Sequence, residues 1–213
     1  MINRIFLALC VFLLILKPVL AGTVAIPLPH HEVNYEIVKD KGLLEIYGRI
    51  DSDTAITTHE AFVDFKKEHV TVVVVHLNSL GGSLGAGAMV IEDMIDARNS
   101  GIHVITIVDH REICASMCTG IFAIGEVRMA APDTFWVFHA PYLADKSLIN
   151  DPEYVGAQQS AVKYLTSLYM LADPKWTTEV LVNHITEQKT DLILSGADIA
   201  KQSETYITKV LTD

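Results

Sequence analysis

Ser116 stands where the chain is predicted to pass from a buried strand into a helix. Residues 102–109 before it are mostly β-branched and apolar, as in a strand, and the small and apolar residues after it predict a helix. Unpaired backbone N–H groups gather in the first turn of a helix, so an oxyanion that forms beside Ser116 would meet oriented donors. The alternative is a serine that caps the helix with its hydroxyl.

Two cysteines, Cys114 and Cys118, flank this serine. They would lie about one turn apart if both were helical, so a disulfide between them is feasible but strained. The same pair could be half of a metal site together with His110, four residues upstream of Cys114. We expect no metal, because no second pair of ligands follows at a spacing typical of zinc.

A nucleophilic serine also needs a base and a carboxylate that orients the base. The nine histidines and 26 acidic residues of the chain allow many false combinations. His139 follows the aromatic strand 135–138 and precedes Ala-Pro, so a rigid turn would hold it at the end of that strand. Catalytic and structural roles are both open for it. For the carboxylate, local sequence does not separate Asp191 from Asp173 or Glu187.

The elements that must position these residues alternate between strand and helix along the chain. Apolar periodicity and β-branched runs predict strands at 43–50, 71–77, 102–109, 127–130 and 135–138, and helices at 55–68, 86–95, 116–124, 152–171 and 175–187. Such alternation favours right-handed crossovers on a mostly parallel sheet. We therefore predict an α/β domain with helices on both sides of the sheet.

A glycine-rich turn, Asn78-Ser-Leu-Gly-Gly, ends the strand that precedes the strand of Ser116. The carboxyl ends of parallel strands share one edge of a sheet, where such folds bind ligands. Gly81 and Gly82 should therefore lie near Ser116.

The N-terminus predicts export. Arg4 precedes an apolar run, and small residues end it near Ala21, so residues 1–21 are interpreted as a signal peptide or, if uncleaved, a membrane anchor. We expect a periplasmic or secreted protein, with a lead segment at 22–42 and one catalytic domain at 43–213. Without residues 1–21 the chain has 14 basic and 26 acidic residues, which argues against nucleic acid or anionic membranes as partners.

Four motifs occur in one order: Asn78-Ser-Leu-Gly-Gly, Cys114-Ala-Ser-Met-Cys, Phe138-His-Ala-Pro and Asp191-Leu-Ile-Leu-Ser-Gly-Ala-Asp. Together they resemble the proteolytic subunit of the Clp proteases and, more widely, ClpP-like serine peptidases of the ClpP/crotonase fold, including exported members without an ATPase. The fold that this implies repeats β-β-α and β-α units. Leu80 replaces the proline usual in the family, and an insertion lies around 109–112.

This resemblance implies a residue for each catalytic role. Ser116 matches the nucleophile, His139 the base and Asp191 the orienting carboxylate. Gly81 and Met117 would supply the two N–H groups of the oxyanion hole. The implied substrate-binding residue is Gly82, which would let the substrate backbone approach without a Cβ clash.

The activity implied is cleavage of peptide bonds through an acyl-enzyme, without a cofactor. Substrates would be peptides or unfolded proteins, and export removes the ATPase that supplies cytosolic relatives. The resemblance also implies a homo-oligomer, trimer-based or ring-shaped. Two rivals stay open: a crotonase-type enzyme acting on acyl-CoA, and a non-catalytic assembly or binding protein whose site is locked by a Cys114–Cys118 bridge.

Overall fold

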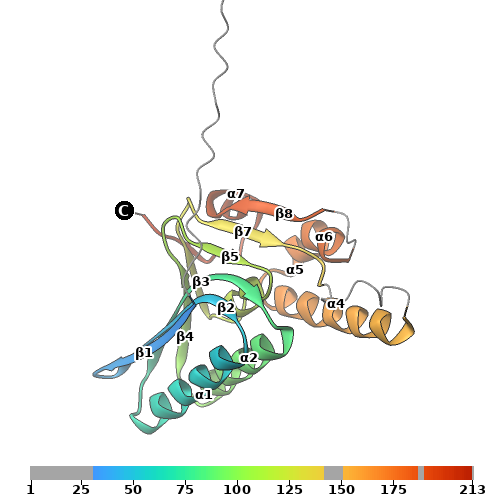
Figure 1. The fold of residues 1–213 in the computed structure, drawn as a ribbon. Helices are drawn as coiled ribbons and strands as arrows, with labels where there is room; N and C mark the ends of the chain where they lie inside the picture. The colour runs from blue at the N-terminus through green and yellow to red at the C-terminus, as the bar shows by residue number, and fades with distance from the viewer. Residues whose placement is uncertain (1–30, 142–150, 187–189, 213) are drawn as a thin grey trace, which may run out of the picture.

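The computed structural model describes residues 31–141, 151–186 and 190–212, which form an α/β unit with a mostly parallel mixed sheet flanked by helices (Figure 1). The strands are β1 (Glu32–Val38), β2 (Lys41–Ile50), β3 (Val72–Gly82), β4 (His103–Val108), β5 (Ile113–Ala115), β6 (Val127–Ala130), β7 (Phe135–Phe138), β8 (Leu192–Ser195) and β9 (Lys209–Val210). The helices are α1 (Ser52–Lys67), α2 (Leu84–Asn99), α3 (Met117–Phe122), α4 (Pro152–Ala172), α5 (Pro174–Trp176), the π-helical turn η2 (Thr177–Leu181), α6 (Val182–Thr186) and α7 (Gly196–Gln202).

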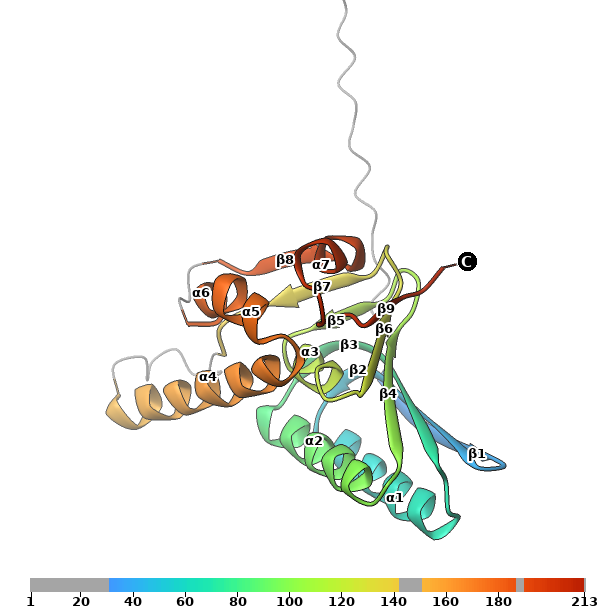
Figure 2. The ribbon, with the colours of Figure 1, turned by 180° about the vertical axis from the view of Figure 1, so that it is seen from behind.

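The sheet divides at β3. One edge of β3 pairs with β2 along its whole length, and the other pairs first with β4 and then, at Ser79, with β5. Because β4 and β5 share that edge, one branch continues from β4 to β6 and β9, and the other from β5 to β7 and β8. Figure 2 shows the first branch from behind, with β9 beside β6. The antiparallel pairs are β1 with β2 and β7 with β8.

Buried and half-buried residues alternate along the strands, and the buried ones form the core. In β3 the residues Val73, Val75 and Leu77 are fully buried, whereas the residues between them are half-buried. This period of two is that of a strand with one face on the core. Helices α1 and α2 cover that face beside β2, β3 and β4, and they contact each other (Figure 1).

Polar residues cap the first turns of α1 and α2. Asp51 caps α1, and its carboxylate accepts hydrogen bonds from the N–H groups of Asp53 and Thr54. Ser83 caps α2 by accepting from the N–H of Ala86 at 3.2 Å. Both caps satisfy donors that a helix leaves unpaired at its first turn. The glycine turn at the end of β3 is therefore continuous with the start of α2.

Three parts of the sheet differ from the sequence prediction. The lead segment expected at 22–42 contains β1 and the start of β2, which form a hairpin. Residues 102–109 do not run directly into the helix of Ser116, because a turn at 109–112 moves the chain from β4 to β5. The C-terminal part adds β8 and β9, which are too short to show a period.

Candidate active site

Ser116 lies at a sharp turn between β5 and α3. Its backbone has φ 56° and ψ −124°, a left-handed φ that costs free energy in a residue with a Cβ. The residue is half-buried among fully buried neighbours. Its side chain makes no cap hydrogen bond to α3, so the capping role that the sequence left open is not the one it has here.

The backbone of Ser116 is fixed from two sides. Its N–H donates to the carbonyl of Val137 in β7 at 2.9 Å, and its carbonyl accepts from the N–H of Thr119 at 3.0 Å and the Thr119 hydroxyl at 2.5 Å. These bonds tie the turn both to the neighbouring strand and to the first turn of α3. The strained φ is therefore held by surrounding structure, as observed at many functional sites.

Gly81 packs directly on this turn, as the parallel-sheet argument predicts. A Cβ built on Gly81 would lie 2.5 Å from the carbonyl oxygen of Ala115, 2.6 Å from the Cβ of Ser116 and 2.9 Å from the nitrogen of Met117. Gly81 also has φ 82°. A residue without a side chain is required here on both counts.

The two predicted oxyanion donors have different environments. Met117 is the first residue of α3, so its N–H has no carbonyl within the helix to pair with. The N–H of Gly81 donates to the hydroxyl of Ser79 at 3.0 Å, and that hydroxyl donates to the carbonyl of Gly48 at 2.6 Å. An oxyanion would have to share or replace the Ser79 oxygen as the acceptor of Gly81.

Gly82 has a structural reason of its own to be glycine. A Cβ there would lie 2.1 Å from the carbonyl oxygen of Ile50, the last residue of β2. The close approach of β2 thus accounts for the missing side chain. Its predicted contact with substrate stays a prediction.

His139 directly follows β7 and is half-buried. It comes two residues after Val137, whose carbonyl binds the Ser116 backbone, so the sheet brings nucleophile and predicted base to adjacent strand ends. Its Nδ1 lies 2.8 Å from the carbonyl oxygen of Ala140. Because a carbonyl only accepts, Nδ1 carries the hydrogen, and the lone pair of the neutral ring is on Nε2.

Asp191 directly precedes β8 and is exposed. The antiparallel register ends with the pair Phe138 and Leu192, so His139 and Asp191 each lie one residue beyond the last pair of β7 and β8. The hydrogen bond from His139 Nδ1 nevertheless goes to Ala140 instead of to this carboxylate. The structure thus brings the two residues to neighbouring positions, and orientation of the base by Asp191 would require the ring to exchange its partner.

Of the two competing carboxylates, the structure describes Asp173. Asp173 is buried and accepts from the hydroxyl of Ser203 at 2.5 Å and from the backbone N–H groups of Trp176 and Thr205 at 2.9 and 3.1 Å. Its carboxylate is therefore already engaged as the N-cap of α5. Glu187 lies outside the described residues.

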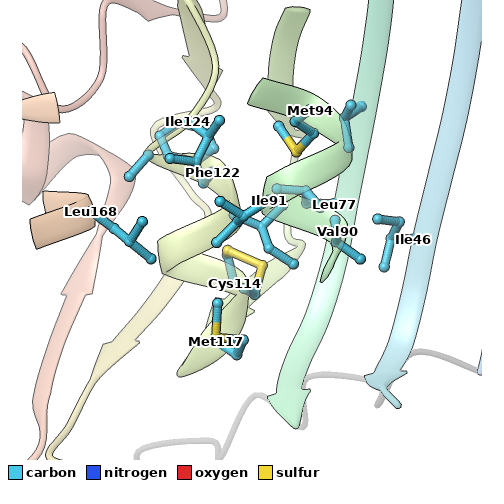
Figure 3. Close-up of a cluster of buried hydrophobic side chains, with 14 of the residues drawn as sticks. Ile46, Leu77, Val90, Ile91, Met94, Cys114, Met117, Phe122, Ile124 and Leu168 are labelled. Carbon is cyan, nitrogen blue, oxygen red and sulfur yellow. A yellow bond between two sulfur atoms is a disulfide. The ribbon is translucent and has the colours of Figure 1, made fainter. Parts of the chain in front are cut away.

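Cys114 and Cys118 form a disulfide, with their Cα atoms 5.3 Å apart. Only Cys118 is helical, since Cys114 belongs to β5, so the bridge joins a strand to a helix across the turn of Ser116. Both cysteines are fully buried. Figure 3 shows the bridge within a cluster of buried side chains that includes Ile91 and Met117.

Buried hydroxyl groups of Thr119, Tyr169 and Tyr206 form hydrogen bonds next to the turn of Ser116. The Thr119 hydroxyl lies 2.7 Å from the hydroxyl of Tyr169 in α4, and Tyr206 donates to the Thr119 carbonyl at 2.8 Å. Thr119 already gives its hydrogen to Ser116, so Tyr169 is the donor to Thr119. Burial raises the pKa of Tyr169 to about 12, which keeps this donor protonated. Sequence reasoning missed these contacts.

A second network anchors the turn that leads into β5. Nε2 of His76 lies 2.8 Å from the Glu112 carboxylate, and its Nδ1 lies 2.9 Å from the hydroxyl of Tyr47, which donates to Glu45. Burial alone would lower the pKa of His76, but the hydrogen bond and charge of Glu112, with the charges of Asp109 and Glu45, raise it overall. His76 in β3 is thus hydrogen-bonded to the turn through Glu112, and this carboxylate favours the protonated form of the ring.

No group of three metal-binding side chains occurs within residues 31–141, 151–186 and 190–212. None of the helices described in these ranges is long and apolar enough to span a membrane. The predicted signal peptide, residues 1–21, lies outside them.

Comparison of the chain with protein-family models and with curated proteins finds no match. Evidence for the function of this site therefore comes from its geometry.

Proposed function

We propose that the chain is a serine-type hydrolase that cleaves peptide bonds through an acyl-enzyme on Ser116. The observation that carries the proposal is the conformation of Ser116. Its backbone has a left-handed φ at the turn between β5 and α3, its hydroxyl does not cap α3, and Gly81 packs against it. A strained strand-to-helix turn of this kind exposes the nucleophilic serine in α/β-hydrolases.

In the proposed mechanism, Ser116 Oγ attacks the substrate carbonyl and gives its proton to Nε2 of His139. That nitrogen has the lone pair, because Nδ1 donates to Ala140. The Met117 N–H stabilises the oxyanion, and the Gly81 N–H joins it once the oxyanion competes with Ser79. Asp191 would orient His139 if the ring turns towards it. His139 then protonates the leaving amine, and a water molecule hydrolyses the acyl-enzyme by the reverse steps.

The proposal includes a ClpP/crotonase-like fold for the catalytic domain. The order of Gly81, Ser116, His139 and Asp191 along the branch β3, β5, β7 and β8 supports it. Substrates would be short peptides or unfolded chains, and neither a cofactor nor an ATPase partner is needed. A trimer-based or ring-shaped homo-oligomer and an exported location belong to the same proposal.

Labelling with a fluorophosphonate probe, followed by mapping of the modified residue, tests the proposal. We expect modification of Ser116 and hydrolysis of an unfolded peptide substrate, with both lost in Ser116→Ala. Ser160→Ala, on the exposed side of α4, is the matched control and should keep both. His139→Gln should lose activity, whereas His103→Gln should retain it. Undiminished labelling of Ser116→Ala would contradict the proposal.

A non-catalytic binding protein is the second candidate function. It is favoured by two internal hydrogen bonds, from Gly81 to Ser79 and from His139 to Ala140, which occupy groups that catalysis needs. The absence of both labelling and hydrolysis in a folded protein would support this candidate.

A further inference from the structure

The disulfide is centred on Ser116. Cys114 precedes the serine by two residues and Cys118 follows it by two, so the bridge closes a short loop with Ser116 at its middle. No side chain of the proposed site is itself a cysteine. The bridge thus constrains the backbone of the nucleophile without taking part in the chemistry.

The elements on either side of Ser116 are short. β5 has three residues and meets β3 at a single register pair, Ser79 with Cys114, and α3 has six residues. Short helices and strands gain little stability from their own hydrogen bonds. The disulfide connects the middle residue of β5 to the first turn of α3 covalently, and so maintains the angle between them.

The relaxed alternative for Ser116 is an ordinary N-cap. An N-cap serine has an extended backbone, and its hydroxyl accepts from N–H groups two or three residues later. In that state Oγ would point at α3 and no longer be free to attack, and its new partners would be Cys118 or Thr119. Release of the strained φ therefore favours a conformation in which the nucleophile is misplaced.

We propose that the Cys114–Cys118 disulfide is a positioning element that holds Ser116 in its reactive conformation, so that the oxidised chain is the active form. This inference rests on the proposed function. A dithiol that is present while the chain folds, before the cysteines are buried, would leave the protein inactive by thiol–disulfide exchange. One of its thiolates attacks a cysteine sulfur and forms a mixed disulfide, and the second thiolate then displaces the remaining cysteine. The dithiol loses two electrons and two protons to the cysteines and becomes a cyclic disulfide.

The test compares the purified chain refolded under oxidising conditions, the same chain refolded with dithiothreitol, and the double variant Cys114→Ala/Cys118→Ala. We expect fluorophosphonate labelling of Ser116 to slow by on the order of a hundredfold in the reduced chain and in the variant, since misplaced reacting groups cost about that much. Peptide hydrolysis should lose kcat with little change in KM. Hydrogen exchange at residues 114–119 should accelerate, and the rest of the sheet should stay protected.

The controls separate this inference from the proposed function. Dithiothreitol should leave the double variant unchanged, which shows that reduction acts through this bridge. Equal labelling of Ser116 in oxidised, reduced and variant proteins would overturn the positioning role and leave the hydrolase proposal intact. Faster labelling after reduction would also overturn it, since the bridge would then lock the site. No labelling of Ser116 in any form would overturn both.

Discussion

The substitution Gly81→Ala should displace the turn that carries Ser116. The added Cβ would lie 2.5 Å from the carbonyl oxygen of Ala115, 2.6 Å from the Cβ of Ser116 and 2.9 Å from the nitrogen of Met117. Two of these three atoms are backbone atoms, which cannot rotate away. The turn itself must therefore move.

The expected loss of stability has two parts. A left-handed φ costs a residue with a Cβ roughly 1–2 kcal/mol, and overpacking in a tight site adds roughly 1–3 kcal/mol. Gly81→Ala should therefore lower the free energy of unfolding by roughly 2–5 kcal/mol. Gly101→Ala is the matched control, because Gly101 has φ 90° and a Cβ there would meet no atom within 4 Å. It should lose only the first part.

Urea unfolding of both variants, together with fluorophosphonate labelling, measures the two effects. Gly81→Ala should have the lower denaturation midpoint and should label Ser116 slowly, whereas Gly101→Ala should label at the wild-type rate. Equal midpoints and equal labelling in the two variants would show that Gly81 does not pack on the nucleophile's turn as described.

Three further predictions concern the supports of the site. Replacing both Cys114 and Cys118 by alanine should lower stability by about 2 kcal/mol, from the entropy of the short loop they close, as measured by urea unfolding. Tyr169→Phe removes a buried hydrogen bond and should cost about 1 kcal/mol and slow labelling of the nucleophile, while Tyr164→Phe on the same helix should do neither. The raised pKa of His76 means that its protonated form stabilises the fold fully below its ordinary pKa of about 6.5, and less as pH rises through the raised value. The stability difference between wild type and His76→Gln should therefore shrink as pH rises, and a difference that grows with pH would contradict the ion pair.

Elements with a clear period could be predicted from the sequence. The predicted strand 71–77 overlaps β3 from Val72 onward, although β3 continues to Gly82, and the predicted helix 152–171 is α4 to within one residue. β5 could not be found in this way, because three residues show no period. Its existence depends on the turn at 109–112, which moves the chain to the other branch of the sheet.

The same distinction between predictable and unpredictable features holds for the site. The proximity of Gly81 to Ser116 follows from parallel topology, and the structure bears it out. The contacts of Thr119 with Tyr169 and of His76 with Glu112 join residues 50 and 36 positions apart. Local patterns carry no information on such pairs, since the packing of whole elements brings them together. For the same reason sequence could not show which acceptor His139 Nδ1 would take.

The burial of the disulfide has a consequence for how the protein is made. Both cysteines, one in β5 and the other in α3, are fully buried, so oxidants and reductants have poor access to them once the core has closed. The bridge must form while this part of the chain is still open, early in assembly. The environment in which the chain folds would then fix the state of the nucleophile's turn, and the finished molecule would retain that state afterwards.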